Sequence, residues 1–141
     1  LVTTSSYGYP KRTASGFDQN RMNLLIAMLE RRTKLNLADK DVYVNVVGGI
    51  KVTEPAADLA VVMAIASASK GLQLKKDAVV FGELGLSGEV RRVPFAEKRV
   101  AEAKKLGFSG AIGPKLREKQ PVGLLPVGSV REALNTYLEK E

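Results

Sequence analysis

Residues 54–71 read EPAADLAVVMAIASASKG, and this apolar, alanine-rich stretch is the strongest indication of the fold in the sequence. Pro55 stands where a proline commonly starts a helix, because its fixed φ suits the first turn and no backbone N–H is needed there. Nothing then interrupts a helix as far as Lys70, and Gly71 follows in the position that often ends one. We predict a helix over 56–70, buried at the centre of the protein.

Two further helices are predicted on either side of this stretch. One covers 19–32, because Asp18 can cap its N-terminus and apolar residues then recur at helical spacing, namely Met22, Leu25, Ile26 and Leu29. Its apolar stripe is expected to lie in the core. The other covers 94–106, since Pro94 is suited to open a helix and Gly107 stands just past its end.

The last predicted helix covers 130–140, where Ser129 and Glu132 form a capping box. Short runs rich in β-branched residues predict strands over 1–6, 42–47, 50–53, 78–81, 89–93, 109–112 and 122–127. Residues 7–16 are expected to form a loop and 82–88 a turn, since glycine or proline interrupts both. Strands and helices alternate without regular βαβ spacing, so the predicted fold class is α+β, a two-layer α/β sandwich.

The composition restricts the chemistry. With 141 residues the chain is long enough for one globular domain with a substantial core, and we predict a single domain over 1–141. It has no cysteine and no histidine, which excludes disulfides, thiol catalysis, Cys-ligated zinc and the commonest general base. No apolar run long enough to cross a bilayer and no export leader is found, so we expect a cytoplasmic protein without membrane contact.

The net charge of +7 favours a polyanionic partner, because cationic side chains that contact phosphates release counterions. Basic residues concentrate in two segments, Lys11, Arg12, Arg21, Arg31, Arg32 and Lys34 in the first, and Arg91, Arg92, Lys98, Arg99, Lys104 and Lys105 in the second. Any one of these residues is equally explained as a solvated surface charge. The clustering is what indicates nucleic acid.

Catalytic motifs are few. No GxxxxGK[ST] loop is present and no glycine fingerprint opens a helix after a strand, so nucleotide binding has no motif in this segment. Glu54 and Asp58 lie four residues apart and suggest a paired acid site, but acids at a helix N-terminus also favour its dipole, and we assign them that role. The remaining nucleophilic scheme pairs a serine or threonine with a desolvated lysine base, and it needs a serine at a helix start.

Three segments resemble the Lon-protease domain in order and spacing. They are 54–58 (EPAAD), 82–90 (GELGLSGEV) and the helix expected after Pro94. In that family a GPSAG segment presents the nucleophilic serine and a lysine 43 residues later is its base, so the resemblance assigns these roles to Ala56 and Arg99. Alanine has no nucleophile and arginine stays protonated, so neither fills its role. The motif's flanking glycines are replaced by Glu54 and Asp58.

The positions of the other candidate residues argue against a displaced catalytic pair. Lys98 is adjacent to Arg99, but one residue along a helix turns a side chain by about 100° to a different face. Ser67 and Ser69 lie inside the central helix and Ser87 in a turn, away from the helix start where an oxyanion is held. We therefore expect no catalytic activity of this segment; an active Ser-Lys peptidase is the enzyme alternative.

A longer pattern covers essentially the whole chain. It consists of Lys11-Arg12, Gly16-Phe17-Asp18, Asn20-Arg21, the helix end at 29–32, and the runs at 54–60 and 82–93. In this pattern the chain resembles the bacterial RadA (Sms) family of RecA-like repair proteins, which carry a degenerate Lon-type domain. The resemblance implies an ATP-dependent, DNA-binding motor of recombination and repair, assembled as a hexameric ring with this segment as its second tier. It also implies ATP, magnesium and zinc for the full-length protein, whose ATPase domain would precede the strand and loop at 1–16, and no cofactor or metal in this segment.

The two basic segments supply the working hypothesis for DNA contact, namely Arg12, Arg21, Arg91, Arg92, Lys98 and Arg99. Guanidinium forks suit phosphate, so we expect backbone contact with single-stranded, duplex or branched DNA and no sequence readout. A RecA-type recombinase is a further expected partner. Two alternatives stay open: a pure oligomerisation scaffold, whose basic residues meet acidic surfaces of neighbouring subunits, and ribosomal RNA binding, because one ribosomal protein domain shares the Lon-type fold.

Overall fold

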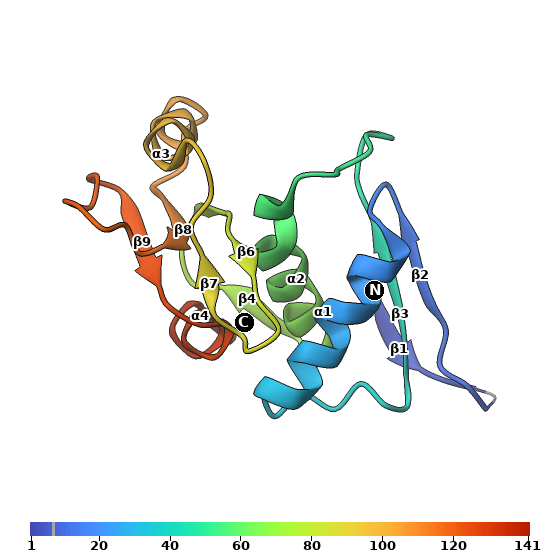
Figure 1. Ribbon diagram of the computed structural model, residues 1–141. Coiled ribbons are helices and arrows are strands. Elements are labelled where there is room, and N and C mark those ends of the chain that lie inside the picture. Colours follow the sequence, from blue (N-terminus) through green and yellow to red (C-terminus); the bar gives the residue numbers. More distant parts are fainter. Residues whose placement is uncertain (7) are drawn as a thin grey trace.

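The computed structural model describes residues 1–6 and 8–141, and across them the fold is a mixed α+β arrangement built around one buried helix. This helix, α2 (Asp58–Lys70), follows a short 3-10 turn, η1 (Pro55–Ala57), and ends at Gly71, whose φ of 63° is left-handed. Its long apolar side chains Leu59, Val62, Met63 and Ile65 are almost fully buried. Figure 1 shows α2 at the centre of the molecule, as the sequence predicts.

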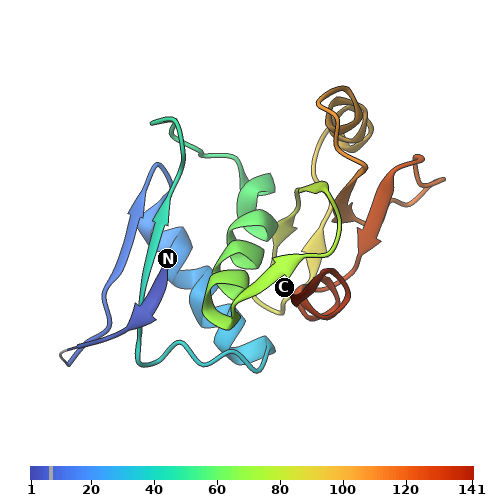
Figure 2. The ribbon, with the colours of Figure 1, turned by 180° about the vertical axis from the view of Figure 1, so that it is seen from behind.

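On one side of α2 lie a second helix and a three-stranded sheet. Helix α1 (Gln19–Arg32) is capped by Asp18, whose carboxylate accepts a hydrogen bond from the backbone N–H of Arg21 at 2.8 Å. In the sheet, β3 (Lys40–Asn45) pairs antiparallel with β1 (Val2–Thr4) and parallel with β2 (Arg12–Ser15). Figures 1 and 2, which view the molecule from opposite sides, both place this sheet at one end, with α1 and α2 between it and the remaining strands.

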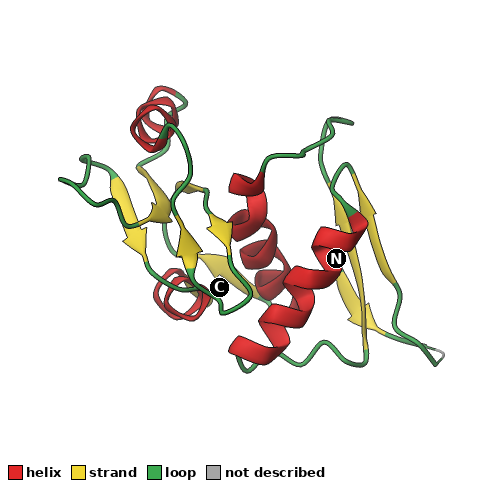
Figure 3. Ribbon diagram, viewed as in Figure 1, coloured by secondary structure: helices red, strands yellow, loops and turns green. Residues whose placement is uncertain are grey.

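The other side of α2 carries several small sheets and two helices (Figure 3). The parallel sheet has the order β5-β8-β9, and two antiparallel pairs accompany it. The strands are β4 (Leu72–Leu74), β5 (Ala78–Val80), β6 (Glu83–Leu84), β7 (Val90–Arg91), β8 (Gly110–Pro114), β9 (Leu124–Val127) and β10 (Leu138–Lys140), with β4 paired to β10 and β6 to β7. Helix α3 (Ala96–Lys105) packs on β8, and α4 (Val130–Tyr137) packs on α2.

Two apolar cores result from this arrangement. The main core joins α1, α2 and α4 with strands from both ends of the molecule. A smaller core lies under α3, where Val100 and Ala103 meet Phe81, Ala111 and Leu124. Helix α3 is thus held to the protein by a separate and smaller apolar contact than the other helices.

Most of the predicted helices are confirmed, and their ends show where local signals misled. The last helix ends at Tyr137, three residues before its predicted end, because the chain continues as β10 and pairs with β4. Ser129 caps α4 as expected, its Oγ accepting from the N–H of Glu132 at 3.1 Å, but the Glu132 carboxylate accepts from Gly128 and not from the capping residue. Pro94 does not open α3, since Phe95 intervenes with a left-handed φ of 64°.

Several predicted strands are present as β1, β3, β5, β8 and β9, but the shortest strands were missed or placed wrongly. The loop predicted over 7–16 contains β2, and of that prediction only Tyr7 lies outside the described residues. The strand predicted over 50–53 is a single bridge between Val52 and Phe17. Strands β4 and β6 were not predicted, and the strand over 89–93 shrinks to β7. These strands have two to four residues, too few for a clear local pattern. Strands β2 and β4 form through partners distant in sequence, whereas β6 and β7 pair with each other across a turn.

Candidate functional site

Of the two positions that the Lon-type pattern assigns to a catalytic pair, Ala56 lies at the start of α2, and Arg99 on α3 contacts the neighbouring Glu54. Ala56 lies in η1 and is 4% exposed. Its carbonyl accepts a hydrogen bond from the N–H of Gly82 at 2.7 Å, and the Gly82 carbonyl accepts from the N–H of Leu59 at 3.0 Å. Gly82 has a φ of 149°, and a Cβ there would come within 2.9 Å of the Val90 side chain. The backbone before β6 is therefore held directly against the helix start.

On one side of Ala56, Asp58 forms a buried ion pair with Arg21. Asp58 is 1% exposed, and its carboxylate accepts from Arg21 Nε at 3.1 Å and from Arg21 Nη2. The same carboxylate accepts from the N–H of Leu84 at 3.1 Å, while Arg21 Nη2 also donates to the Leu84 carbonyl at 3.1 Å. One bidentate pair thereby joins α1, α2 and β6.

The charge on Arg21 is secured by this environment. The hydrogen bond to Asp58 raises the pKa of the Arg21 guanidinium above its ordinary value, and the nearby negative charges of Asp58 and Glu83 add to the rise against the opposing effect of burial. Arg21 therefore stays charged wherever the protein is folded. Its side chain is 31% exposed, so one edge of the guanidinium still meets solvent.

On the other side of Ala56, Arg99 reaches from α3 to Glu54. Arg99 Nη2 donates to the Glu54 carboxylate, and Arg99 Nε donates to the Pro94 carbonyl at 3.0 Å. The Arg99 guanidinium carbon also lies 5.9 Å from the centre of the Phe81 ring, within the range of a cation–π contact. The Glu54 side chain is 56% exposed, so this pair lies at the surface.

These contacts define what the site can do. Both carboxylates stand where the Lon motif has glycines, and each binds an arginine from a different part of the chain. At the two assigned positions there is neither a nucleophile nor a group able to accept a proton. The helix-dipole role assigned to Glu54 and Asp58 was incomplete, since Asp58 does lie in the first turn of α2 but both side chains form ion pairs.

The six residues predicted to contact DNA are dispersed over the fold. Arg12 lies on β2, and its Nη2 donates to the Leu37 carbonyl at 2.6 Å and lies 3.9 Å from Glu30. Strand β2 stands at the opposite end of the molecule from α3, which carries Lys98 and Arg99 (Figure 1). The structure therefore does not gather the six residues into one surface.

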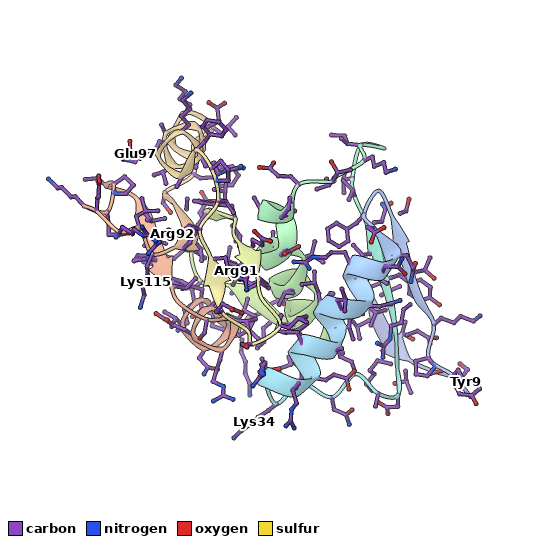
Figure 4. The ribbon with its side chains drawn as sticks, in the orientation of Figure 1. Tyr9, Lys34, Arg91, Arg92, Glu97 and Lys115 are labelled. Atoms are coloured by element: carbon purple, nitrogen blue, oxygen red, sulfur yellow. The ribbon has the colours of Figure 1, made fainter. Side chains whose placement is uncertain are left out.

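Arg91, Arg92 and Lys98 are the exposed members of the set. Arg91 lies 3.5 Å from Glu89, Arg92 Nε donates to the carbonyl of Lys115 at 3.3 Å, and Lys98 Nζ lies 5.2 Å from the centre of the Phe95 ring. In Figure 4 Arg91, Arg92 and Lys115 lie in the same region, over β7 and β8. Four of the six predicted residues, Arg12, Arg21, Arg91 and Arg99, have a carboxylate within 4 Å.

A second basic group was not chosen from the sequence, although three of its members stand in the first basic segment. This helix-end basic group comprises Arg31, Arg32, Lys34, Lys70 and Arg131, all exposed, at the ends of α1, α2 and α4. Lys70 and Arg131 are distant in sequence from the other three, so charge clustering along the chain could not reveal them. Within the described part of the chain, no carboxylate lies within 4 Å of these five cations.

The described residues include neither a candidate metal site nor a candidate membrane span. They contain no group of three or more His, Cys, Asp or Glu side chains that could hold a metal ion. No helix among them is both long enough and apolar enough to cross a membrane.

Comparison with known proteins connects this arrangement to DNA repair. The model of the family described as "Subunit ChlI of Mg-chelatase" matches residues 11–116. The DNA repair protein RadA of Aquifex aeolicus is 48% identical over 136 residues, which cover 95% of this chain and 31% of the relative. RadA of Escherichia coli is 45% identical over 141 residues, and RadA of Bacillus subtilis 43% over 143, covering 97% and 98% of this chain and 31% of each relative. The sequence-based resemblance to RadA is confirmed, and the chain spans about a third of the length of these relatives.

Proposed function

Because the chain belongs to the family described as subunit ChlI of Mg-chelatase and is similar to RadA over nearly its whole length, we propose that it is the non-proteolytic, DNA-contacting Lon-type domain of a RadA-type repair protein. We place it in the bacterial cytoplasm, as a two-layer α/β sandwich that forms one domain beside an ATPase domain. ATP, magnesium and zinc belong, in this proposal, to the rest of that protein. The similarity to DNA repair proteins at 43–48% identity is the observation that carries it.

The degenerate site supports the non-proteolytic part of the proposal. A Ser-Lys peptidase needs a hydroxyl at the helix start and an uncharged amine beside it. Here the corresponding positions are Ala56 and Arg99, and Arg99 is engaged with Glu54. The same elements that would form a catalytic centre are instead joined by two arginine–carboxylate pairs, which serve the fold.

The distribution of charge supports DNA contact. The chain carries +7, and cationic side chains that contact a phosphate backbone release its counterions, which favours binding. Of the six residues predicted from the sequence, Arg91, Arg92 and Lys98 present exposed cationic groups, whereas Arg21 and Arg99 are committed to partners within the chain. The proposed phosphate contacts therefore rest mainly on Arg91, Arg92 and Lys98.

A second candidate function is an assembly module, in which the chain forms part of a hexameric ring and does not touch DNA. One observation favours it: four of the six predicted DNA contacts are already paired with carboxylates of the same chain. Arginines that bind carboxylates within the chain have the chemistry to bind carboxylates of a neighbouring subunit as well. A RecA-type recombinase would bind through the same arginine–carboxylate contacts.

The test is the salt dependence of DNA binding. Titrating the chain with labelled single-stranded and duplex DNA, followed by fluorescence anisotropy, should give a log–log slope against salt of several units, at about 0.7–0.9 for each phosphate contacted. The double variant Arg91→Glu/Arg92→Glu should weaken binding and reduce the slope by about one to two units. Lys75→Glu/Lys76→Glu is the matched control, since both lysines are exposed, adjacent and outside the predicted set.

The outcomes separate the two candidates. Binding that responds to the arginine pair and not to the lysine pair supports phosphate contact by Arg91 and Arg92. A chain that binds neither DNA at low salt, while sedimenting as a ring, would leave only the assembly module. An unchanged slope in the arginine variant would refute the choice of these two residues.

A further inference from the structure

A cavity of about 440 Å³ opens where the ends of α1, α2 and α4 meet β4 and β10. Its lining residues are Thr33, Lys34, Leu35, Ala66, Lys70, Leu72, Arg131, Leu134, Asn135 and Leu138. The volume lies in the range of sites that hold small organic ligands, roughly 300–1,000 Å³. None of these lining residues is among those proposed above to contact DNA.

The floor of the cavity is apolar. Leu35, Ala66 and Leu138 are buried, and Leu72 and Leu134 are half-buried. These side chains come from three helices or their ends and from both strands of the β4–β10 pair, so the rest of the fold holds them in place. A flat organic group that binds here would bury its apolar surface against these aliphatic side chains, and removing apolar surface from water lowers the free energy.

The rim is cationic. Lys34, Lys70 and Arg131 line the opening, no acidic side chain is among the lining residues, and Arg31 and Arg32 are close by in sequence. In the described residues none of these five has a carboxylate within 4 Å, in contrast to Arg21 and Arg99. Cations that are not neutralised within the chain leave a positive potential at the mouth of the cavity.

Helix capping explains only part of this group. Arg31, Arg32 and Lys70 lie in the last turns of α1 and α2, where a cation favours the helix dipole. Lys34 lies beyond α1, and Arg131 lies in the first turn of α4, where the dipole disfavours a cation. Arg131 donates from Nε and Nη2 to the carbonyl of Arg32 at 3.3 and 3.0 Å, which holds its guanidinium at the rim.

An apolar floor beneath a cationic rim matches a ligand with a flat, weakly polar body and an attached anion. We propose that this cavity binds a nucleotide unit, with the base against the leucines and the phosphate on Lys34, Lys70 and Arg131. Bases taken out of a stack are held between apolar side chains in this manner, and the exposed amide of Asn135 on the rim can pair with a base edge. The nucleotide is either a free molecule or one unit of a single DNA strand. Only binding of a strand rests on the proposed function.

The first experiment uses three probes on the ¹⁵N-labelled chain: deoxyadenosine monophosphate, deoxyadenosine and inorganic phosphate. The monophosphate should shift the amide signals of Leu35, Leu72 and Leu138 with a saturable curve. The nucleoside and phosphate, each holding half of the ligand, should bind at least tenfold more weakly. Equal shifts with phosphate alone would reduce the site to an anion contact and overturn the role of the apolar floor.

Two variants then test the site itself. Lys70→Glu should weaken monophosphate binding at least tenfold, whereas Lys105→Glu, also an exposed lysine in the last turn of a helix, should leave it unchanged. Asn135→Phe changes no charge, and because Asn135 is exposed on α4 and lines the cavity, the larger side chain should block entry without unfolding the protein. Binding that survives both Lys70→Glu and Asn135→Phe would overturn the proposal.

A short oligodeoxyadenylate distinguishes the source of the nucleotide. If the strand is the ligand, it should bind at least tenfold more tightly than the monophosphate, and Asn135→Phe should cancel that advantage. Strand binding that is intact in Asn135→Phe but lost in Arg91→Glu/Arg92→Glu would support DNA contact while refuting the cavity as its site. Monophosphate binding without any strand binding would support the cavity and refute the proposed DNA contact.

Discussion

The two ion pairs beside Ala56 are alike in chemistry and different in surroundings. Arg21–Asp58 ties α1 to the start of α2, and its carboxylate is 1% exposed. Arg99–Glu54 ties α3 to the same helix start, and its carboxylate is 56% exposed. Both carboxylates stand at glycine positions of the Lon-type pattern. The same short motif therefore forms one buried ion pair and one ion pair at the surface.

The difference lies in what happens when a partner is lost. Asp58 is 1% exposed, so removing Arg21 leaves a buried charge whose remaining hydrogen-bond donor is the Leu84 N–H. Glu54 is solvated already, and Arg99 keeps its hydrogen bond to the Pro94 carbonyl without it. We infer that the first pair maintains the main fold, while the second positions α3, which rests on its own smaller core.

The largest effect is expected from Arg21→Ala. The free energy of unfolding should fall by about 3–5 kcal/mol, because the buried Asp58 carboxylate loses its counter-charge. Urea denaturation followed by circular dichroism measures the change. Arg31→Ala on the same helix is the control, since Arg31 is exposed and has no ion-pair partner among the described residues, and it should stay within about 0.5 kcal/mol of the parent.

A decrease of less than about 1 kcal/mol in the free energy of unfolding of Arg21→Ala would contradict the difference drawn between the two pairs. The buried pair would then contribute no more than a surface pair does. A loss as large in Arg31→Ala would show instead that α1 is sensitive to any substitution.

A smaller effect is expected from Glu54→Gln. The exposed pair should contribute no more than about 1 kcal/mol, and the difference from the parent should shrink in 1 M salt, where charges are screened within about 3 Å. Denaturation at low and high salt measures both quantities. A loss above 2 kcal/mol, or one that salt does not reduce, would mean that the Arg99 contact is as essential as that of Arg21.

No gain of activity is expected from Ala56→Ser combined with Arg99→Lys. The introduced lysine would lie beside Glu54, and the neighbouring carboxylate would raise the pKa of its amine and keep it from accepting a proton. The double variant should therefore remain unlabelled by a serine-reactive fluorophosphonate probe.

Adding Glu54→Gly to that double variant sharpens the test, because it restores a glycine of the motif and removes the carboxylate. Labelling confined to the triple variant would identify Glu54 as the obstacle. Labelling of the double variant would contradict the role assigned to Glu54.

Much of the fold and the loss of catalytic groups can be predicted from local sequence. The α1 and α2 helices follow from periodicity and end signals such as Asp18 and Gly71, which act through neighbours in the chain. The vacant roles at Ala56 and Arg99 follow from residue identity alone. The short strands were missed, because β2, β4 and β10 exist only through pairing with distant segments.

The candidate surfaces were predicted less well, for a related reason. Charge clusters along the chain selected Arg12, Arg21 and Arg99, yet folding brings each of them to a carboxylate. The helix-end basic group combines Lys70 and Arg131 with a segment far from both in sequence.

Residue identity and order are enough to place the helices and their ends, the excess of cations, and the lack of a nucleophile or base at the two pattern positions. Which of the described cations pair with a carboxylate distant in sequence, and which do not, follows only from the tertiary packing of those segments. The physical reason is range: helix formation and capping act over three or four residues, whereas ion pairs and cavities depend on distances between segments that only packing sets.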